Sequence, residues 1–409
     1  MYKKFFRGQK SSNTRFVRRK RSSAPSGAGR SGGPRRRAGR GGEVIHPSRF
    51  IQKGASAEQV EVFVPEHTFF DFAISAELKQ AIEKRGYSTP TPIQDGLIPY
   101  ILKGKDVIGI ANTGTGKTGA FLIPLLDKIL HNRKEQILIM APTRELAMQI
   151  DDELKALSRG LKVYSVCCVG GMNIGPQIRA LRQFNNVVVG TPGRLKDLME
   201  QRVLRLSAFH TLVLDEADRM LDMGFIDDMR FIVAAMPKKR HTLFFAATMS
   251  PEIEKLTKTF LTDPAHISVK KQDTSKNVDQ DVVRVPRAVD KIDILRDLLI
   301  QDEFSKVLIF GRTKHGVEKL SKQLTKKGIS ATSIHGNKNH AQRQRALKQF
   351  KDESVRVLVA TDVAARGLDI PNVTHVINFD VPATYDDYVH RIGRTGRGDK
   401  SGKALTFVE

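Results

Sequence analysis

The chain has 409 residues, of which 40% are hydrophobic, and it carries a formal net charge of +24. This length allows two domains with separate cores, and without an apolar run of about 18 residues we expect no membrane span. The positive charge favours a polyanionic partner, and the basic start of the chain lacks an apolar signal region, so we expect a cytoplasmic protein. Adjacent Cys167 and Cys168 lie in an apolar run and predict buried, reduced core residues rather than a disulfide framework.

Residues 1–65 predict a disordered basic tail and linker. Residues 1–53 hold 16 lysines and arginines against one acidic residue, Glu43, and they are rich in glycine and serine. A segment of this composition buries too little apolar surface to fold. We expect the tail to contact nucleic-acid phosphates without sequence preference, and the alternative is a solubilising tail with no specific role.

Residues 66–270 alternate short apolar runs with amphipathic stretches, which predicts a first α/β domain. Helices are expected at 144–158 and 175–184, among others. Because strands that alternate with helices form parallel sheets, we expect a mostly parallel sheet with helices on both faces. The expected strands are 107–110, 136–140, 163–169, 187–190, 211–214 and 242–246.

A polar stretch at 271–281 predicts a linker to a second α/β domain at 282–409. Helices are expected there at 314–327 and 340–351. The second domain has no glycine-rich lysine loop, so only the first domain is expected to hold phosphates. The expected strands are 282–285, 306–310, 330–334, 355–360, 374–379 and 403–408.

The segment Ala111-Asn112-Thr113-Gly114-Thr115-Gly116-Lys117-Thr118 follows the first expected strand. Its glycines allow backbone N–H groups to close around phosphate oxygens, and Lys117 adds a positive charge. The Thr118 hydroxyl is a candidate ligand of Mg2+. Because the strict pattern begins with glycine where this chain has Ala111, the loop alone is an imperfect indication of nucleotide binding.

The acidic tetrad Asp215-Glu216-Ala217-Asp218 follows the expected strand at 211–214. A carboxylate at this strand end suits Mg2+, and Glu216 is placed to orient or deprotonate an attacking water. Acidic quartets alone usually begin solvated helices. Two such segments at the carboxyl ends of strands, where open α/β sheets bind ligands, together predict binding and hydrolysis of a nucleoside triphosphate.

In the second domain, His390-Arg391-Ile392-Gly393-Arg394-Thr395-Gly396-Arg397 places three arginines within seven residues. An isolated basic triplet is usually a solvated helix face, but the glycines argue against a simple helix. Arg394 and Arg397 are three apart, so one helical turn would aim both at a single anion such as a triphosphate transition state. Asp369, after another strand, is a candidate acceptor for a ribose hydroxyl, and the alternative is an ordinary helix start capped by Asp362.

The order of these motifs resembles the DEAD-box ATP-dependent RNA helicases, which have two RecA-like domains. The resemblance covers roughly residues 66–409 and leaves out only the basic tail. The Ile334-His335-Gly336-Asn337-Lys338 stretch is most similar to the bacterial RhlE-type branch. Further matching motifs are Gly86-Tyr87, Thr91-Pro92-Ile93-Gln94, Pro142-Thr143-Arg144-Glu145-Leu146-Ala147, Gly170-Gly171 and Thr191-Pro192-Gly193-Arg194.

The resemblance implies an ATP site built from both domains. Gln94, in a region at 67–95, would read the adenine edge, with Phe69 and Tyr87 packing near the base. The phosphates would be held by the loop from Ala111 to Thr118, and Gly367 and Asp369 would lie at the ribose. Catalysis would rest on Lys117, Asp215, Glu216 and two arginine fingers, Arg394 and Arg397. Mg2+ would be held by Thr118 and Asp215.

The resemblance also implies RNA gripped mainly by its sugar-phosphate backbone, with low sequence specificity. ATP and single-stranded RNA would together close the two domains, bend one strand and destabilise a short duplex, and hydrolysis would reopen the clamp. Nothing in the sequence indicates an obligate oligomer, so a monomer is expected. The implied RNA track comprises Arg144, Gly171, Thr191, Arg194 and Arg343.

Three positions depart from the family pattern. Ala246-Ala247-Thr248 stands where the family usually has Ser-Ala-Thr, so a hydroxyl expected to couple the tetrad to His390 is missing. ATP hydrolysis is then expected to survive while strand separation weakens. His340 stands where the family often has Gln, and a tolerated polar swap is the favoured interpretation. The chain stops at Glu409, just after the last expected strand, which suggests a fragment or a shortened domain.

The leading interpretation is an RNA-stimulated ATPase that unwinds short duplexes or remodels RNA–protein complexes. The alternative kept open by Ala246 is an ATP-gated RNA clamp with weak unwinding. A DNA helicase is disfavoured by the Gln94 segment and the spelled-out tetrad. A scaffold with vestigial motifs is disfavoured by the intact Lys117, Glu216, Arg394 and Arg397. The physiological RNA and pathway are not specified by the sequence.

Overall fold

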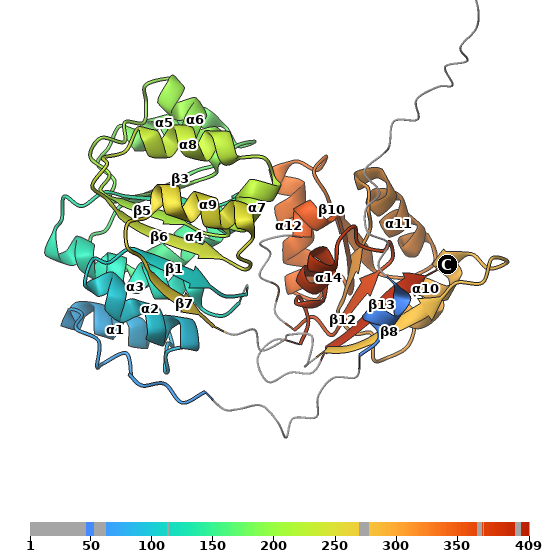
Figure 1. Cartoon of the computed structure of the whole chain (residues 1–409). Helices are drawn as coiled ribbons and strands as arrows, with labels where there is room; N and C mark the ends of the chain where they lie inside the picture. The colour runs from blue at the N-terminus through green and yellow to red at the C-terminus, as the bar shows by residue number, and fades with distance from the viewer. Residues whose placement is uncertain are drawn as a thin grey trace, which may run out of the picture. The chain divides into compact units, whose positions relative to one another are not determined.

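The computed structural model describes residues 46–52, 63–112, 114–269, 278–365, 370, 372–396 and 402–408. Within them the chain forms two parallel β-sheets, each packed between helices (Figure 1). The predicted fold class, two tandem α/β domains with mostly parallel sheets, is therefore confirmed. The expectations for residues 1–45 and 53–62 of the tail lie outside the described residues. Among the described helices, none is long and apolar enough to cross a membrane.

The sheet of the first domain has the strand order β3-β4-β2-β5-β6-β1-β7, and every pairing is parallel. Its central strands are buried on both faces, which is why they read as continuous apolar runs. The strands are β1 (Val107–Ile110), β2 (Ile137–Met140), β3 (Ser165–Cys168), β4 (Val187–Gly190), β5 (Thr211–Leu214), β6 (His241–Ala246) and β7 (Ala265–Ser268).

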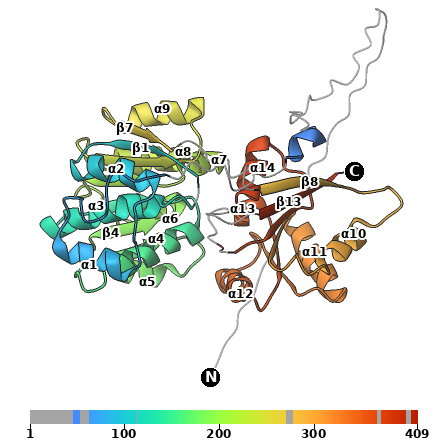
Figure 2. The same cartoon turned by 90° about the horizontal axis from the view of Figure 1, so that it is seen from below.

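Helices on the two faces of this sheet complete two separate hydrophobic cores (Figure 2). One core contains α1 (Ala76–Lys84), α2 (Pro92–Leu102), α3 (Lys117–His131) and α4 (Arg144–Leu157). The other contains α5 (Ile174–Leu181), α6 (Pro192–Glu200), α7 (Ala217–Asp222), α8 (Ile226–Ala234) and α9 (Pro251–Phe260).

The sheet of the second domain has the order β10-β11-β9-β12-β13-β8, again with parallel pairings throughout. Its strands are β8 (Val278–Arg284), β9 (Val307–Phe310), β10 (Ala331–Ile334), β11 (Val357–Ala360), β12 (His375–Asn378) and β13 (Gly402–Val408). Its helices are α10 (Lys291–Leu299), α11 (Lys314–Lys326), α12 (His340–Lys351), α13 (Asp362–Ala365) and α14 (Tyr385–Ile392).

The structure differs from the sequence expectations at three places. Strand β8 begins at Val278, so residues 278–281 of the expected linker belong to the sheet. Strand β7 was not expected, since Ala265–Ser268 shows little apolar character. Residues 46–52, expected to be disordered, include a short 3-10 helix, η1 (Pro47–Phe50), that packs against the second domain. Strands β7 and β8 are both edge strands of their sheets, where one side faces solvent and the hydrophobic pattern is weak.

The two cysteines are free, as expected from their adjacent positions. Cys168 is buried, but Cys167 is only partly buried because consecutive residues of β3 point to opposite faces of an edge strand. Burial raises the pKa of both thiols to about 12.

Candidate functional site

Three segments whose residues suit nucleotide chemistry meet at one edge of the first sheet. The glycine-rich loop follows β1, the acidic tetrad follows β5, and Ala247 and Thr248 follow β6. Strands β5, β6 and β1 are consecutive neighbours and run in parallel, so their carboxyl ends lie together. This edge is where open parallel sheets bind ligands.

The glycine-rich loop has the backbone of a phosphate cradle. Gly114 and Gly116 have φ of 87° and 93°, a left-handed conformation that few other residues adopt. Gly116 is the N-cap of α3, so the N–H groups of the first turn of this helix point towards the loop. The buried Lys117 ammonium donates to the Ala111 carbonyl at 2.9 Å. Thr113 lies outside the described residues.

The loop is tied to the neighbouring strand and to itself. The Ala111 N–H donates to the Ala246 carbonyl at 3.1 Å, which extends the pairing of β1 and β6 by one bond. The Thr115 hydroxyl donates to the Asn112 carbonyl at 2.8 Å. These bonds hold the described residues of the loop in place.

Gln94 lies directly against the start of α3. Its side-chain amide donates to the Gly116 carbonyl at 3.0 Å, and its side-chain oxygen accepts the Thr91 N–H at 2.9 Å. A Cβ added at Gly119 would lie 2.7 Å from this amide nitrogen and 3.1 Å from the Tyr87 ring. Gln94 is thus fixed at the mouth of the phosphate loop by contacts that tolerate little change.

The two aromatic residues expected near the base pack against each other in the core that contains α2 and α3. Phe69 is buried and meets Tyr87 edge to face, with ring centroids 5.8 Å apart. The Tyr87 hydroxyl donates to Glu153 at 3.1 Å, and burial raises the pKa of this phenol. The exposed aromatic residue in this segment is the neighbouring Phe70.

The tetrad brings carboxylates into a buried position. Burial raises the pKa of Asp215 to about 6, nearby Lys117 opposes this rise, and the adjacent Glu216 carboxylate adds to it. Glu216 has a φ of 51°, a strained value for a residue with a side chain. Its carboxylate is 3.0 Å from the buried Arg219 guanidinium. Arg219 therefore contributes to the position of Glu216.

The last tetrad residue joins the tetrad to the end of β6. One Asp218 carboxylate oxygen accepts the N–H groups of Ala247 at 2.9 Å and Thr248 at 3.1 Å, and also the Thr248 hydroxyl at 3.3 Å. The other oxygen accepts the Arg219 N–H at 3.0 Å. Ala246, which precedes this contact, is fully buried. The connection survives the missing hydroxyl because backbone groups make most of it.

The donor set near the loop suits a hard divalent cation. Thr118 supplies a hydroxyl in the first turn of α3, and Asp215 supplies a carboxylate whose burial disfavours its charge unless a cation is near. Among the described residues, no group of three or more His, Cys, Asp and Glu side chains forms a ready-made metal site. Oxygen ligands from a triphosphate would complete such a site.

The expected RNA residues of the first domain lie at a different part of the same edge. Strands β3, β4 and β2 are neighbours, and Gly171, Thr191 and Arg144 follow them. A Cβ added at Gly171 would overlap the Arg144 guanidinium, so these two residues are in direct contact. The Arg194 guanidinium donates to the Gln177 side chain at 3.0 Å and to the Met172 carbonyl at 3.3 Å.

The arginine-rich segment of the second domain is not one continuous helix. Helix α14 ends at Ile392, so Arg394 lies in the turn that follows, and the expectation of a helical turn carrying two arginines is wrong. The glycines at 393 and 396 end the helix there. Arg391 has a structural role instead, since its guanidinium forms two bonds to Asp362, at 2.6 and 2.8 Å.

The remaining expected residues of the second domain are placed only in part. His390 lies on α14, and both Arg343 and His340 lie on α12. Gly367, Asp369 and Arg397 lie outside the described residues.

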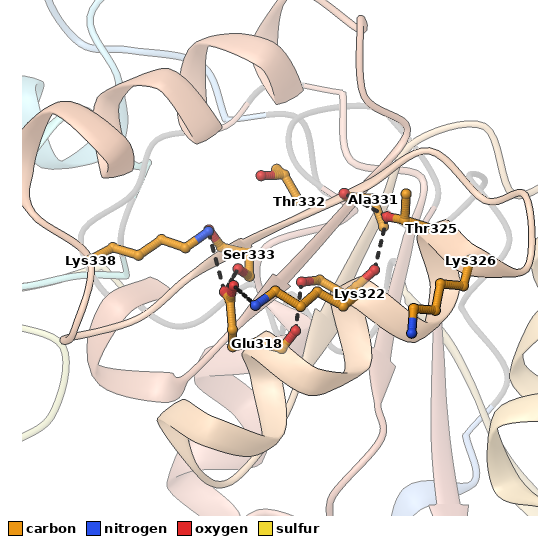
Figure 3. Close-up of a pocket in the computed structure, with 9 residues that line it drawn as sticks. Glu318, Lys322, Thr325, Lys326, Ala331, Thr332, Ser333 and Lys338 are labelled. Atoms are coloured by element: carbon orange, nitrogen blue, oxygen red, sulfur yellow. Dashed lines mark hydrogen bonds and ion pairs between the residues drawn. The ribbon is translucent and has the colours of Figure 1, made fainter.

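A cavity of about 390 Å³ lies in the second domain between α11 and β10 (Figure 3). Glu318 at its wall accepts from Ser333 at 2.6 Å and from His335 at 3.1 Å, and Lys322 and Lys338 approach it as well. The Ser333 hydrogen bond, with these cationic neighbours, lowers the pKa of Glu318 to about 2. Lys322 and Lys338 at its wall are already paired with the Glu318 carboxylate, so the cavity does not resemble a phosphate site.

Sequence reasoning missed two residues of the site. Arg219 reads as an ordinary charged residue of a helix, yet it is buried and contacts Glu216. Asp218 was named only as part of the tetrad, yet it joins the tetrad to the end of β6. An arginine three residues after the tetrad glutamate, at the start of a predicted helix, is the signal that indicates such a pair.

Two family models match the chain. One, described as DEAD/DEAH box helicase, matches residues 91–256, and the other, described as helicase conserved C-terminal domain, matches residues 290–399. A protein of Bacillus subtilis (strain 168) named DEAD-box ATP-dependent RNA helicase CshA is 48% identical over 343 residues, and the match covers 83% of this chain and 69% of that protein.

Solved structures agree with these matches. S. cerevisiae Dbp5 bound to RNA and ADP BeF3 is 29% identical with a TM-score of 0.74, and the match covers 84% of this chain and 89% of that one. DEAD-box helicase Mss116 bound to ssRNA and UDP-BeF is 31% identical with a TM-score of 0.76, and the match covers 84% of this chain and 76% of that one.

Proposed function

The chain belongs to the DEAD-box family of ATP-dependent RNA helicases, and from this premise we propose how its own residues bind ATP, bind RNA and couple the two. It is an enzyme that hydrolyses ATP and acts on RNA. The observation that carries the proposal is the meeting of loop, tetrad and Thr248 at the ends of β1, β5 and β6.

We propose that ATP is bound between Gln94 and the glycine-rich loop. Gln94 reads the adenine edge with a side chain already oriented by Thr91 and Gly116. Phe69 and Tyr87 support this wall. Lys117 exchanges its bond to the Ala111 carbonyl for one to a phosphate oxygen. Because Ala111 belongs to the same loop, this exchange needs no large movement of the lysine. The other residues of the loop from Ala111 to Thr118 bind the phosphates through their backbone N–H groups.

Hydrolysis needs a water aligned with the terminal phosphate. Glu216 orients this water, and Arg219 holds Glu216 in place. Thr118 and Asp215 would hold Mg2+, which neutralises phosphate charge when bound. Gly367 and Asp369 are proposed to contact the ribose, and Arg394 and Arg397 to act as arginine fingers from the second domain. ATP turnover then depends on closure of the two domains.

The RNA is proposed to be gripped by its sugar-phosphate backbone. Arg144, Gly171, Thr191 and Arg194 come together at the ends of β2, β3 and β4, and Arg343 adds to the track from the second domain. Backbone contacts carry little sequence information, so the enzyme should accept many RNA sequences.

The same proposal extends to the protein's oligomeric state, location, domain bounds, family branch and basic tail. The protein acts as a monomer in the cytoplasm, and its ATP-binding and C-terminal helicase domains span 66–270 and 282–409. The RhlE-type branch is supported by the His335-Gly336-Asn337-Lys338 stretch. The basic tail is proposed to add sequence-independent contacts to RNA phosphates.

Strand separation is proposed to survive the Ala246 substitution. Asp218 is held by two backbone N–H groups and by the Thr248 hydroxyl, none of which needs a hydroxyl at position 246. The alternative, a clamp with weak unwinding, is therefore not favoured. The coupling to His390 would run through Asp218 and Thr248.

Restoring the family serine tests this. In Ala246→Ser we expect ATP turnover and unwinding of a short RNA duplex each to change by less than about twofold, which is a barrier change below about 0.5 kcal/mol. Asp218→Asn is the matched comparison, since it weakens the bonds to Ala247 and Thr248 and should reduce unwinding per ATP hydrolysed. A large gain of unwinding in Ala246→Ser, at unchanged ATP turnover, would revive the clamp.

A further inference from the structure

Residues 46–52, which precede the first domain in the chain, are bound by the second domain. The short blue helix η1 lies beside β8 in both views, and Figure 2 shows it next to α14 as well (Figures 1 and 2). Phe50 is 1% exposed, and it packs with Val278, Tyr388, Ile392 and Ala404 in a small core of its own. This degree of burial is what a folded core residue shows, and a residue of a solvated tail does not reach it.

The anchor is aromatic at its centre. The Phe50 and Tyr388 rings are 4.7 Å apart between centroids, at an interplanar angle of 55°. Beside it, the Arg49 guanidinium lies over the Tyr385 ring, 4.1 Å from the centroid. A buried aromatic side chain flanked by a stacked arginine is the composition of a strong anchoring contact between two surfaces.

The backbone of the segment pairs with the sheet. Gln52 and Gln280 exchange both N–H···O bonds, at 3.0 and 2.7 Å, in an antiparallel bridge. Strand β8 is the outer strand of its sheet, so this bridge uses its open side. The Tyr388 hydroxyl donates to the Gln280 side chain at 2.9 Å, which links the bridge to the aromatic anchor. Main-chain pairing at a sheet edge plus one side-chain pocket is a recurring mode of peptide recognition.

We propose that α14, β8 and β13 form a binding surface whose occupant is residues 46–52 of the same chain. The two domains are then joined twice, once through residues 53–62 and once through residues 270–277. From Gln52 to Phe63 is 11 residue steps, so the first connection spans at most about 3.5 Å per step, or about 39 Å. The segment thereby limits how far the first domain can move from β8, and it attaches the basic tail to the second domain rather than to the first.

A disulfide placed across the bridge tests the docking without ATP or RNA. In an antiparallel pair that exchanges both hydrogen bonds, the Cα atoms lie about 5.5 Å apart, which suits a disulfide. We expect Gln52→Cys with Gln280→Cys, in the full chain, to form an intramolecular bond in a glutathione buffer. The native thiols, whose pKa values burial raises to about 12, should compete little. Gln52→Cys with Asp279→Cys is the control, because Asp279 points to the opposite face.

The anchor is tested by adding Phe50→Ala to the cysteine pair. We expect the equilibrium constant for disulfide formation to fall at least about tenfold, since truncating a buried phenylalanine removes most of its packing. Ile51→Ala, at a neighbouring residue that is 54% exposed, should leave it unchanged. Equal bonding with Asp279→Cys, no response to Phe50→Ala, or a disulfide only between two molecules would each overturn the proposal.

One further measurement rests on the proposed function. If the segment stays docked throughout turnover, the enzyme with the closed disulfide should show RNA-stimulated ATP turnover within about twofold of the reduced enzyme. A loss of activity that reduction restores would show that the active enzyme must release the segment, and would contradict a permanent second connection. Because the disulfide itself needs neither ATP nor RNA, failure of docking and failure of the proposed function are distinguishable.

Discussion

Gly119→Ala should loosen Gln94, the side chain proposed to read the adenine edge, without unfolding the protein. An added Cβ would lie 2.7 Å from the Gln94 amide nitrogen and 3.1 Å from the Tyr87 ring. The first contact is closer than real Cβ contacts allow, so the Gln94 side chain must move. It then loses its 3.0 Å bond to the Gly116 carbonyl.

The magnitudes separate stability from recognition. Within α3, alanine gains about 1 kcal/mol of helix propensity over glycine. The lost hydrogen bond costs about 1 kcal/mol, so the net change in the free energy of unfolding should be near zero. For the nucleotide, misplacing one hydrogen-bonding group should raise the KM for ATP about five- to tenfold and reduce the preference for ATP over GTP by a similar factor.

Steady-state kinetics with ATP and GTP at saturating RNA measure both effects. Gly175→Ala is the matched control, because that glycine is also within a helix and its added Cβ would make ordinary contacts, at 3.4 Å with Asn173 Oδ1 and at 3.9 Å with Arg179 Nη1. If Gly119→Ala keeps the KM for ATP and the ATP preference of Gly175→Ala, Gln94 does not read the base from the position described above.

Two further predictions concern the tetrad. Arg219→Lys should lower kcat about tenfold with the KM for ATP nearly unchanged, because Glu216 loses the guanidinium that orients it at 3.0 Å; a change confined to KM would refute this role. Since burial raises the pKa of Asp215 to about 6, Mg2+-dependent ATP binding should weaken as pH falls below about 6, and Asp215→Asn should lose that pH dependence. The effect on folding stability has the opposite sign to that of a salt-bridged carboxylate. The folded state holds the Asp215 proton more tightly than the unfolded state does. Asp215 therefore contributes most to the free energy of unfolding at low pH, and its contribution falls as pH rises towards 6. Binding titrations from pH 5 to 7.5 and urea unfolding from about pH 4 to 7 measure the two effects, and a flat binding profile would contradict the first.

The central strands and the loop could be predicted because buried parallel strands leave continuous apolar runs. The tetrad and glycine-rich loop then fall at strand ends, where the structure places them. Edge elements were harder. Strand β8 begins with Val278-Asp279-Gln280-Asp281, which is polar enough to resemble a linker because alternate residues face solvent.

The docked segment could not be predicted from local sequence. Phe50 is a single aromatic residue that follows a glycine- and arginine-rich stretch. Its partners Val278 and Tyr388 are more than two hundred residues away along the chain. The burial of Arg219 and the two hydrogen bonds from Arg391 to Asp362 could not be predicted for the same reason, because their partners come from the tertiary structure. A charged residue on a helix looks solvated until the tertiary structure supplies its partner.

The central claim is that ATP hydrolysis is coupled to RNA. ATP turnover measured without nucleic acid, with single-stranded RNA and with DNA of the same sequence, beside separation of a short RNA duplex, tests it most directly. The account predicts that RNA raises turnover at least about tenfold, that DNA does not, and that the duplex separates only with ATP; Lys117→Ala should abolish both the RNA-stimulated turnover and the duplex separation. Turnover that RNA leaves unchanged, or that DNA stimulates equally, would contradict it.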